Sequence, residues 1–192
     1  MTLVADGLRA EAFFLPLPGR QLFCLFHPAH GECRGAVLYV PPFAEEMNRA
    51  RRIAAQQARE LAALGYGVLQ PDLDGTGDSS GDFGDARWDT WKDDLAACCA
   101  WLGERIAQPP LLWGLRLGAL LALDYAQAAA HPLRALILWQ PVASGQVYLT
   151  QFLRMRTLNA VLADSASEQT GTRALRAALQ SGERVKVIGS GH

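Results

Sequence analysis

Short, continuous runs of apolar residues alternate along this chain with longer segments whose apolar residues recur every three or four positions. The continuous runs predict strands buried on both faces, at residues 35–42, 66–72, 110–113 and 133–141. The periodic segments predict helices at about residues 45–64, 88–106 and 119–130. Strands that alternate with helices of this length predict an α/β fold, in which helices cover both faces of a mostly parallel sheet.

The regions on either side of this alternation have other patterns. Residues 11–28 predict a hairpin whose turn is Pro18-Gly19. After residue 145 the pattern predicts two helices, 146–162 and 172–179, and a short strand at 184–189. We therefore expect an α/β core over 1–145, a helical cap-like segment over 146–183 and a strand and tail over 184–192, within a single domain overall. The chain is either a fragment or a naturally short form, and the sequence does not decide between the two.

Composition excludes several classes of function. The chain has 18 Lys and Arg against 19 Asp and Glu, so no excess of positive charge points to nucleic acid or an anionic membrane. The cluster formed by Arg49, Arg51 and Arg52 is interpreted as a solvated helix face. No apolar run approaches the ~20 residues of a membrane span, and no signal peptide is recognisable, which favours a cytoplasmic protein.

The residues that most often bind metals are not arranged for it. The four cysteines have neither disulfide-framework nor zinc spacing, and we expect them to be reduced. Asp72, Asp74 and Asp78 have oxygen ligands for a metal ion, but Asp-Gly-Thr-Gly-Asp is also what a tight turn needs, and we favour the turn. We therefore predict no metal and no cofactor.

The candidate chemistry centres on a strand-to-helix corner, Gly114-Leu115-Arg116-Leu117-Gly118. In parallel sheets, ligands bind at the carboxyl ends of the strands. The spacing matches Gly-x-Ser-x-Gly, in which a strained corner projects a serine above the sheet and the glycines let helix and strand pass closely. Here the middle residue is arginine.

Further segments indicate a family. They are 38-LYVPPFAEEMNRARR-52, the loop 72-DLDGTGDS-79, 83-FGDARWDTW-91, 113-WGLRLGALLA-122, 139-WQPVASG-145 and 151-QFLRMR-156. With the corner, they resemble the α/β-hydrolase superfamily, and within it the second hydrolase associated with exosortase A systems. The resemblance implies an α/β-hydrolase fold that lacks about two final strands.

The resemblance also implies roles for individual residues. Phe43 and Leu117 would supply the backbone N–H groups that stabilise an oxyanion, although Phe43 is equally expected simply to pack. Arg116 cannot be the acyl nucleophile, because a guanidinium stays protonated. The family's histidine follows its serine, and only His131 and His192 follow Arg116 here, neither well placed.

Two functions therefore stay open. One is a hydrolase or acyltransferase for an ester or thioester in exosortase or exopolysaccharide systems, acting by an unusual mechanism, with Ser79, Ser80 or Ser144 as weak substitute nucleophiles. The other is a non-catalytic binding or regulatory protein.

In this second function the crevice holds a partner protein or an anionic small molecule, such as an acyl-carrier phosphate, a sugar phosphate or an acidic glycan unit. Arg116, Glu45, Asp74 and Ser144 are the candidate ligand-binding residues. Alternatively, Arg116 pairs with Glu45, Glu46 or Asp74 and fills the pocket. The sequence does not indicate an oligomeric state.

Overall fold

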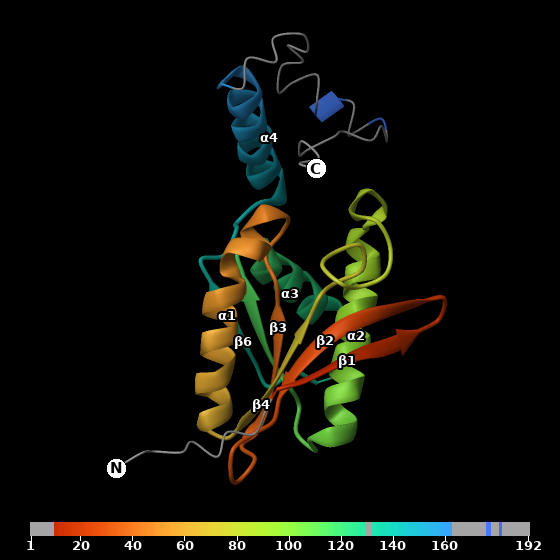
Figure 1. Cartoon of the computed structure of the whole chain (residues 1–192), viewed down its shortest axis with the longest axis vertical. Helices are drawn as coiled ribbons and strands as arrows, with labels where there is room; N and C mark the ends of the chain where they lie inside the picture. Colours follow the sequence, from red (N-terminus) through yellow and green to blue (C-terminus); the bar gives the residue numbers. More distant parts are fainter. Residues whose placement is uncertain (1–9, 130–131, 163–175, 178–180, 182–192) are drawn as a thin grey trace. The chain divides into compact units, whose positions relative to one another are not determined.

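The computed structural model describes residues 10–129, 132–162, 176–177 and 181. Contacts divide the chain into two units, Met1–Pro141 and Val142–His192. The first unit contains a six-stranded sheet of order β1-β2-β4-β3-β5-β6, in which β1, β2 and β4 pair antiparallel and β4, β3, β5 and β6 pair parallel (Figure 1). The strands are β1 (Glu11–Leu17), β2 (Arg20–His27), β3 (Gly35–Val40), β4 (Tyr66–Pro71), β5 (Leu111–Leu115) and β6 (Ala135–Trp139). This is the predicted fold class.

Helices cover both faces of the sheet, as predicted. They are α1 (Glu45–Ala63), α2 (Trp88–Arg105) and α3 (Leu117–Ala128), with a 3₁₀ turn η1 (Phe83–Asp85) before α2. Alternate residues of β3 point to opposite faces: Val37 packs in a cluster with α1, and Leu38 packs in the cluster with α2 and α3. Every residue of β3 is buried, which explains its continuous apolar run.

The strand order predicts the position of a ligand-binding crevice. The chain passes from β3 through α1 to β4 on one side, and β5 then joins the other side of β3. The carboxyl ends of β3 and β5 therefore lie next to each other where the order reverses, which is where open α/β sheets bind ligands. Residues 41–44 follow β3 and Arg116 follows β5, so the sheet brings the two predicted loops together.

The prediction of a fully buried strand at 133–141 is wrong. β6 pairs only with β5 among the described strands, and Ile137 and Leu138 are each 37% exposed. An apolar run shows that a strand favours burial, but burial also needs a neighbour on each side.

The second unit contains α4 (Gly145–Leu162), which matches the helix predicted at 146–162. Most of the helix predicted at 172–179, and all of the strand predicted at 184–189, lie outside the described residues. The boundaries of the three predicted segments stay predictions. None of the helices in the described part of the chain is long and apolar enough to cross a membrane.

Candidate functional site at the carboxyl ends of the strands

The corner between β5 and α3 has the strained backbone that its sequence predicts. Arg116 has φ 56° and ψ −116°, in a region that non-glycine residues rarely adopt, and its N–H donates to the Trp139 carbonyl of β6 at 2.9 Å. Ala44, at the start of α1, has nearly the same backbone conformation, with φ 53° and ψ −128°. Two strained corners therefore meet where the strand order reverses.

Both glycines of the corner are there because the backbone passes too close for a side chain. A Cβ on Gly114 would lie 2.5 Å from the Ala119 Cα, inside the following helix. A Cβ on Gly118 would collide with the carbonyl oxygens of Val40 and Pro41. The glycine spacing thus lets α3 start directly against the end of β3.

A small apolar cavity, which we call the corner cavity, lies beside this corner. Its volume is about 10 Å³, enough for about one water molecule. Its lining comes from the loop after β3, the loop after β4 and the starts of α1, α2 and α3: Pro41, Pro42, Phe43, Ala44, Met47, Leu73, Thr76, Trp88, Trp91, Leu117, Gly118 and Leu121. The cavity is narrow and walled mainly by carbon, so it has no room for an acyl chain in this conformation.

The two expected backbone donors differ in their surroundings. The Phe43 ring packs 5.0 Å from the Phe83 ring and 6.0 Å from the Trp91 ring, between centroids, and its carbonyl accepts from the Glu46 N–H at 3.2 Å. The Phe43 ring thus packs, which is one of the two expectations, while α1 itself begins at Glu45. An oxyanion role for the Phe43 N–H stays a prediction. Leu117 begins α3, and its N–H makes no hydrogen bond with another described residue.

The guanidinium of Arg116 faces a carboxylate. Its Nη2 lies 3.4 Å from Oε1 of Glu46, and the two side chains are 35% and 37% exposed. Of the three acids considered as partners, the structure brings this one into contact. Glu45 instead pairs with Arg49 at 3.6 Å, and Asp74 pairs with Arg20 at 3.6 Å. The pair is therefore partly accessible to solvent.

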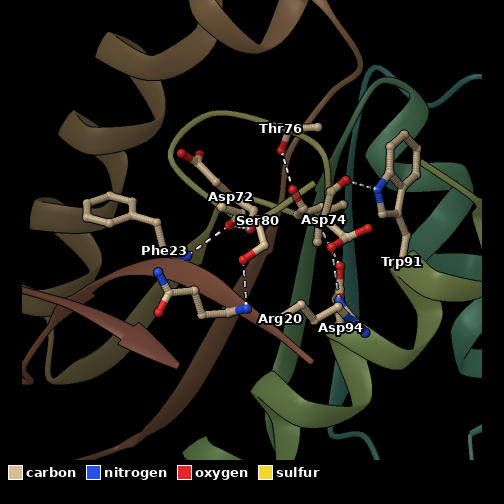
Figure 2. A network of polar contacts seen from close by, with 11 residues as sticks. Arg20, Phe23, Asp72, Asp74, Thr76, Ser80, Trp91 and Asp94 are labelled. Atoms are coloured by element: carbon tan, nitrogen blue, oxygen red, sulfur yellow. Dashed lines mark hydrogen bonds and ion pairs between the residues drawn. The ribbon is translucent and has the colours of Figure 1, made fainter. Parts of the chain in front are cut away.

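The Asp-rich loop after β4 is held by bonds within the protein (Figure 2). The Asp72 carboxylate accepts from the Asp78 N–H at 3.0 Å and receives Nη2 of Arg51 at 3.1 Å on both oxygens. Ser79 Oγ accepts from the Phe23 N–H at 2.8 Å, which ties the loop to β2. Gly75, Gly77 and Gly81 have φ between 55° and 87°. These contacts support the turn interpretation.

Two arginines have roles that the sequence pattern did not show. Arg51 belongs to the cluster interpreted as a solvated face, but it joins α1 to the loop through Asp72. Arg20 bonds to Asp94 of α2, which is fully buried and also accepts from the Asp74 N–H at 2.8 Å (Figure 2). Burial raises the pKa of Asp94, and these hydrogen bonds oppose the shift.

Comparison with known proteins gives the family. The sequence profile described as serine aminopeptidase, S33, of the Hydrolase_4 group, matches residues 31–185, well over half of the chain. The chain belongs to this family of the α/β-hydrolase superfamily. A comparison with curated proteins found no match.

Solved structures agree on the α/β-hydrolase fold. An α/β serine hydrolase without a lid, from Xanthomonas campestris, is 23% identical with a TM-score of 0.62, and the match covers 76% of this chain and 66% of that one. A monoglyceride lipase from Saccharomyces cerevisiae is 21% identical with a TM-score of 0.65, covering 92% and 63%. A carboxyl esterase from Bacillus coagulans is 18% identical with a TM-score of 0.63, covering 88% and 55%. This α/β-hydrolase chain therefore spans less than two thirds of the length of each.

The serines and histidines of this α/β-hydrolase chain do not form a recognisable triad in its described part. Ser79 and Ser80 accept hydrogen bonds from backbone N–H groups of β2, and no histidine lines the corner cavity. Ser144 belongs to the second unit, where its Oγ accepts from the Val147 N–H at 3.4 Å at the start of α4. His131 and His192 lie outside the described residues. Within those residues, no group of three or more His, Cys, Asp and Glu side chains is placed to hold a metal.

Proposed function

We propose that Arg116 stands at the position of the family's nucleophilic serine, and that this corner binds an anionic group instead of cleaving an ester. The observation that carries the proposal is the backbone of Arg116, which has φ 56° and ψ −116° between two glycines that permit close packing. This is the geometry that a nucleophile elbow needs, with a guanidinium in place of a hydroxyl. The family and fold are retained while the reacting atom is exchanged.

A guanidinium changes what the corner does chemically. It has no free electron pair to attack a carbonyl and stays protonated at any ordinary pH. Loss of the nucleophile in a serine enzyme costs on the order of a millionfold in rate. A bound anion, by contrast, benefits from the guanidinium and from the N-terminus of α3, where the Leu117 N–H makes no bond with another described residue.

The contacts at the corner limit what binds. An incoming anion competes with Glu46, whose Oε1 lies 3.4 Å from Arg116, and both side chains are partly exposed. Arg116 and Glu46 do not line the corner cavity, whose volume of about 10 Å³ admits only about one water molecule, so the body of a ligand held by the guanidinium lies outside this cavity. The group that Arg116 binds is a carboxylate or phosphate carried by such a ligand. An acyl-carrier phosphate, a sugar phosphate or an acidic glycan unit has such a group.

The second candidate function is an ester or thioester hydrolase or acyltransferase. Membership in the S33 family favours it. The more specific proposal, a hydrolase associated with exosortase A systems, depends on the resemblance of segments such as 38–52 and 113–122 to that group of hydrolases. This function requires a nucleophile other than Arg116.

Titration with phenyl phosphate tests the first proposal. We expect Arg116→Ala to weaken binding about tenfold or more, because it removes hydrogen bonds to a charged group. Arg49→Ala is the matched control, since Arg49 is an arginine of the same unit whose side chain is 78% exposed, and it should bind as the wild type does. Equal binding by the Arg116 variant contradicts the proposal, and turnover of p-nitrophenyl butyrate by the wild type supports the second candidate.

A further inference from the structure

A second and larger cavity lies between α1 and the sheet. Its volume is about 150 Å³, and we call it the α1 cavity. It is lined by Phe23, Leu25, Tyr39, Pro41, Met47, Arg51, Ala54, Ala55, Gln70, Pro71 and Asp72. Only Pro41 and Met47 also line the corner cavity, and Arg116 and Glu46 line neither. The α1 cavity is thus a separate site, and the proposed role of Arg116 has no bearing on it.

A buried hydroxyl that has no hydrogen-bond partner among the described residues lines the α1 cavity. Tyr39 is 6% exposed, and its ring packs against Trp113 at 4.6 Å between centroids. Its hydroxyl makes no hydrogen bond with another described residue. Burial raises the pKa of Tyr39, an effect that the nearby charge of Arg51 opposes, so the hydroxyl keeps its proton and is a donor. A buried hydroxyl left without a hydrogen-bond partner is costly, and a molecule in the cavity that accepts a hydrogen bond from it removes this cost.

The other polar groups of the lining add donors rather than acceptors. Oε1 of Gln70 lies 3.1 Å from Nε2 of His27, so the oxygen of this amide already has one partner and its NH₂ group is left as a donor. The Asp72 carboxylate already receives Arg51 and the Asp78 N–H. A ligand therefore meets donors from Tyr39 and Gln70, and it needs an acceptor oxygen.

The charge and the size of the cavity restrict the class of ligand further. Arg51 and Asp72 are the charged residues of the lining, and they neutralise each other at 3.1 Å. An ionic ligand would lose its hydration and gain no net opposite charge. The volume of about 150 Å³ matches cavities that hold a benzene molecule. Phe23, Leu25, Met47 and two alanines would surround a ligand of this size with apolar side chains.

We propose that the α1 cavity binds a small uncharged molecule, with an apolar body the size of one aromatic ring and a carbonyl oxygen that accepts a hydrogen bond from Tyr39. The packing between α1 and the sheet gives the site its shape, and the unpaired hydroxyl gives it its polarity. The body of the ligand lies among the apolar side chains, and its oxygen points toward β3.

Acetophenone is the probe, and ethylbenzene is its counterpart without the oxygen. We expect the full chain to bind acetophenone saturably at one site, as followed by NMR titration, and more tightly than ethylbenzene or benzoate. Tyr39→Phe should weaken acetophenone binding about tenfold and leave ethylbenzene binding unchanged, because only the hydroxyl is lost. Ala55→Leu should abolish binding of both, because it fills the cavity.

Ala63→Leu is the matched control for Ala55→Leu, since Ala63 lies on the same helix but is exposed, and it should bind as the wild type does. Thermal unfolding confirms that each variant is folded, and Tyr39→Phe provides the test if Ala55→Leu is not. The absence of saturable acetophenone binding to the wild type overturns the proposal. Unchanged acetophenone binding in Tyr39→Phe or in a folded Ala55→Leu, or equal binding of ethylbenzene or benzoate to the wild type, overturns it as well.

Discussion

Replacing Gly118 by alanine is expected to destabilise the fold, although alanine favours helices over glycine. Gly118 lies in the first turn of α3, and a Cβ there would meet the carbonyl oxygens of Val40 and Pro41 well inside the 3.0 Å that real Cβ contacts do not reach. Both obstacles are backbone atoms at the end of β3, so they cannot rotate away as a side chain can. The start of α3 must move away from the sheet.

The size of the effect is a balance of two terms. Overpacking of this kind costs about 3 kcal/mol, at the upper end of the usual range, because two backbone atoms are involved. Alanine is more favourable than glycine in a helix by about 1 kcal/mol, which offsets part of this cost. We therefore expect the Gly118→Ala variant to lose about 2 kcal/mol in the free energy of unfolding. The same substitution at Gly103 of α2 meets nothing within 4 Å and should leave stability unchanged or raise it by up to about 1 kcal/mol.

Urea unfolding, followed by tryptophan fluorescence, measures both variants. With a slope of about 2 kcal/mol per molar, the midpoint for Gly118→Ala should fall by about 1 M, while that for Gly103→Ala should stay or rise. A Gly118→Ala protein as stable as the wild type would refute the close approach of α3 to β3. A loss of the same size at Gly103 would show that the effect is not specific to the corner.

Three other predictions concern the first unit. Arg20→Ala should lower the free energy of unfolding by about 3 kcal/mol, measured in urea, because it leaves the buried Asp94 without its charge partner; a loss under about 1 kcal/mol would contradict this. In the native protein a thiol reagent should modify only Cys33 quickly, because Cys33 is exposed and the other three cysteines are buried. Cys33→Ser should remove this fast phase of the reaction, and a fast phase in that variant would contradict the burial of the other cysteines. Burial lowers the pKa of His27 below 6.5, and its hydrogen bond to Gln70 opposes this shift. The contribution of neutral His27 to the free energy of unfolding is therefore present above about pH 6.5 and is lost as the pH falls below that value. His27→Gln should lessen the loss of unfolding free energy between pH 7 and pH 5, and an unchanged loss would argue against the lowered pKa.

The elements that the sequence predicted well are those whose pattern is local. β3 is an uninterrupted apolar run and is buried throughout, and the Pro18-Gly19 turn joins β1 and β2 as expected. The glycines at 114 and 118 predicted a close approach because no other residue type permits it. The predicted burial of β6 was wrong because it depends on a neighbouring strand, which the residues of β6 do not specify.

The parts of the site that could not be predicted depend on partners distant in sequence. Arg51 meets Asp72 from 21 residues away, and Arg20 meets Asp94 from 74 residues away. Neither pair leaves a periodic signal in the chain. One of the two alternatives for Arg116 paired it with Glu45, Glu46 or Asp74, and the placement of α1 brings Glu46 to it.

Intact-mass spectrometry after treatment with an ester-directed fluorophosphonate tests the proposal that the corner at Arg116 has no nucleophile. We expect the mass of the folded protein to stay unchanged under conditions in which an active serine hydrolase is fully labelled. A stoichiometric increase by the mass of one phosphonyl group, located by peptide mapping on any serine of the chain, would contradict it.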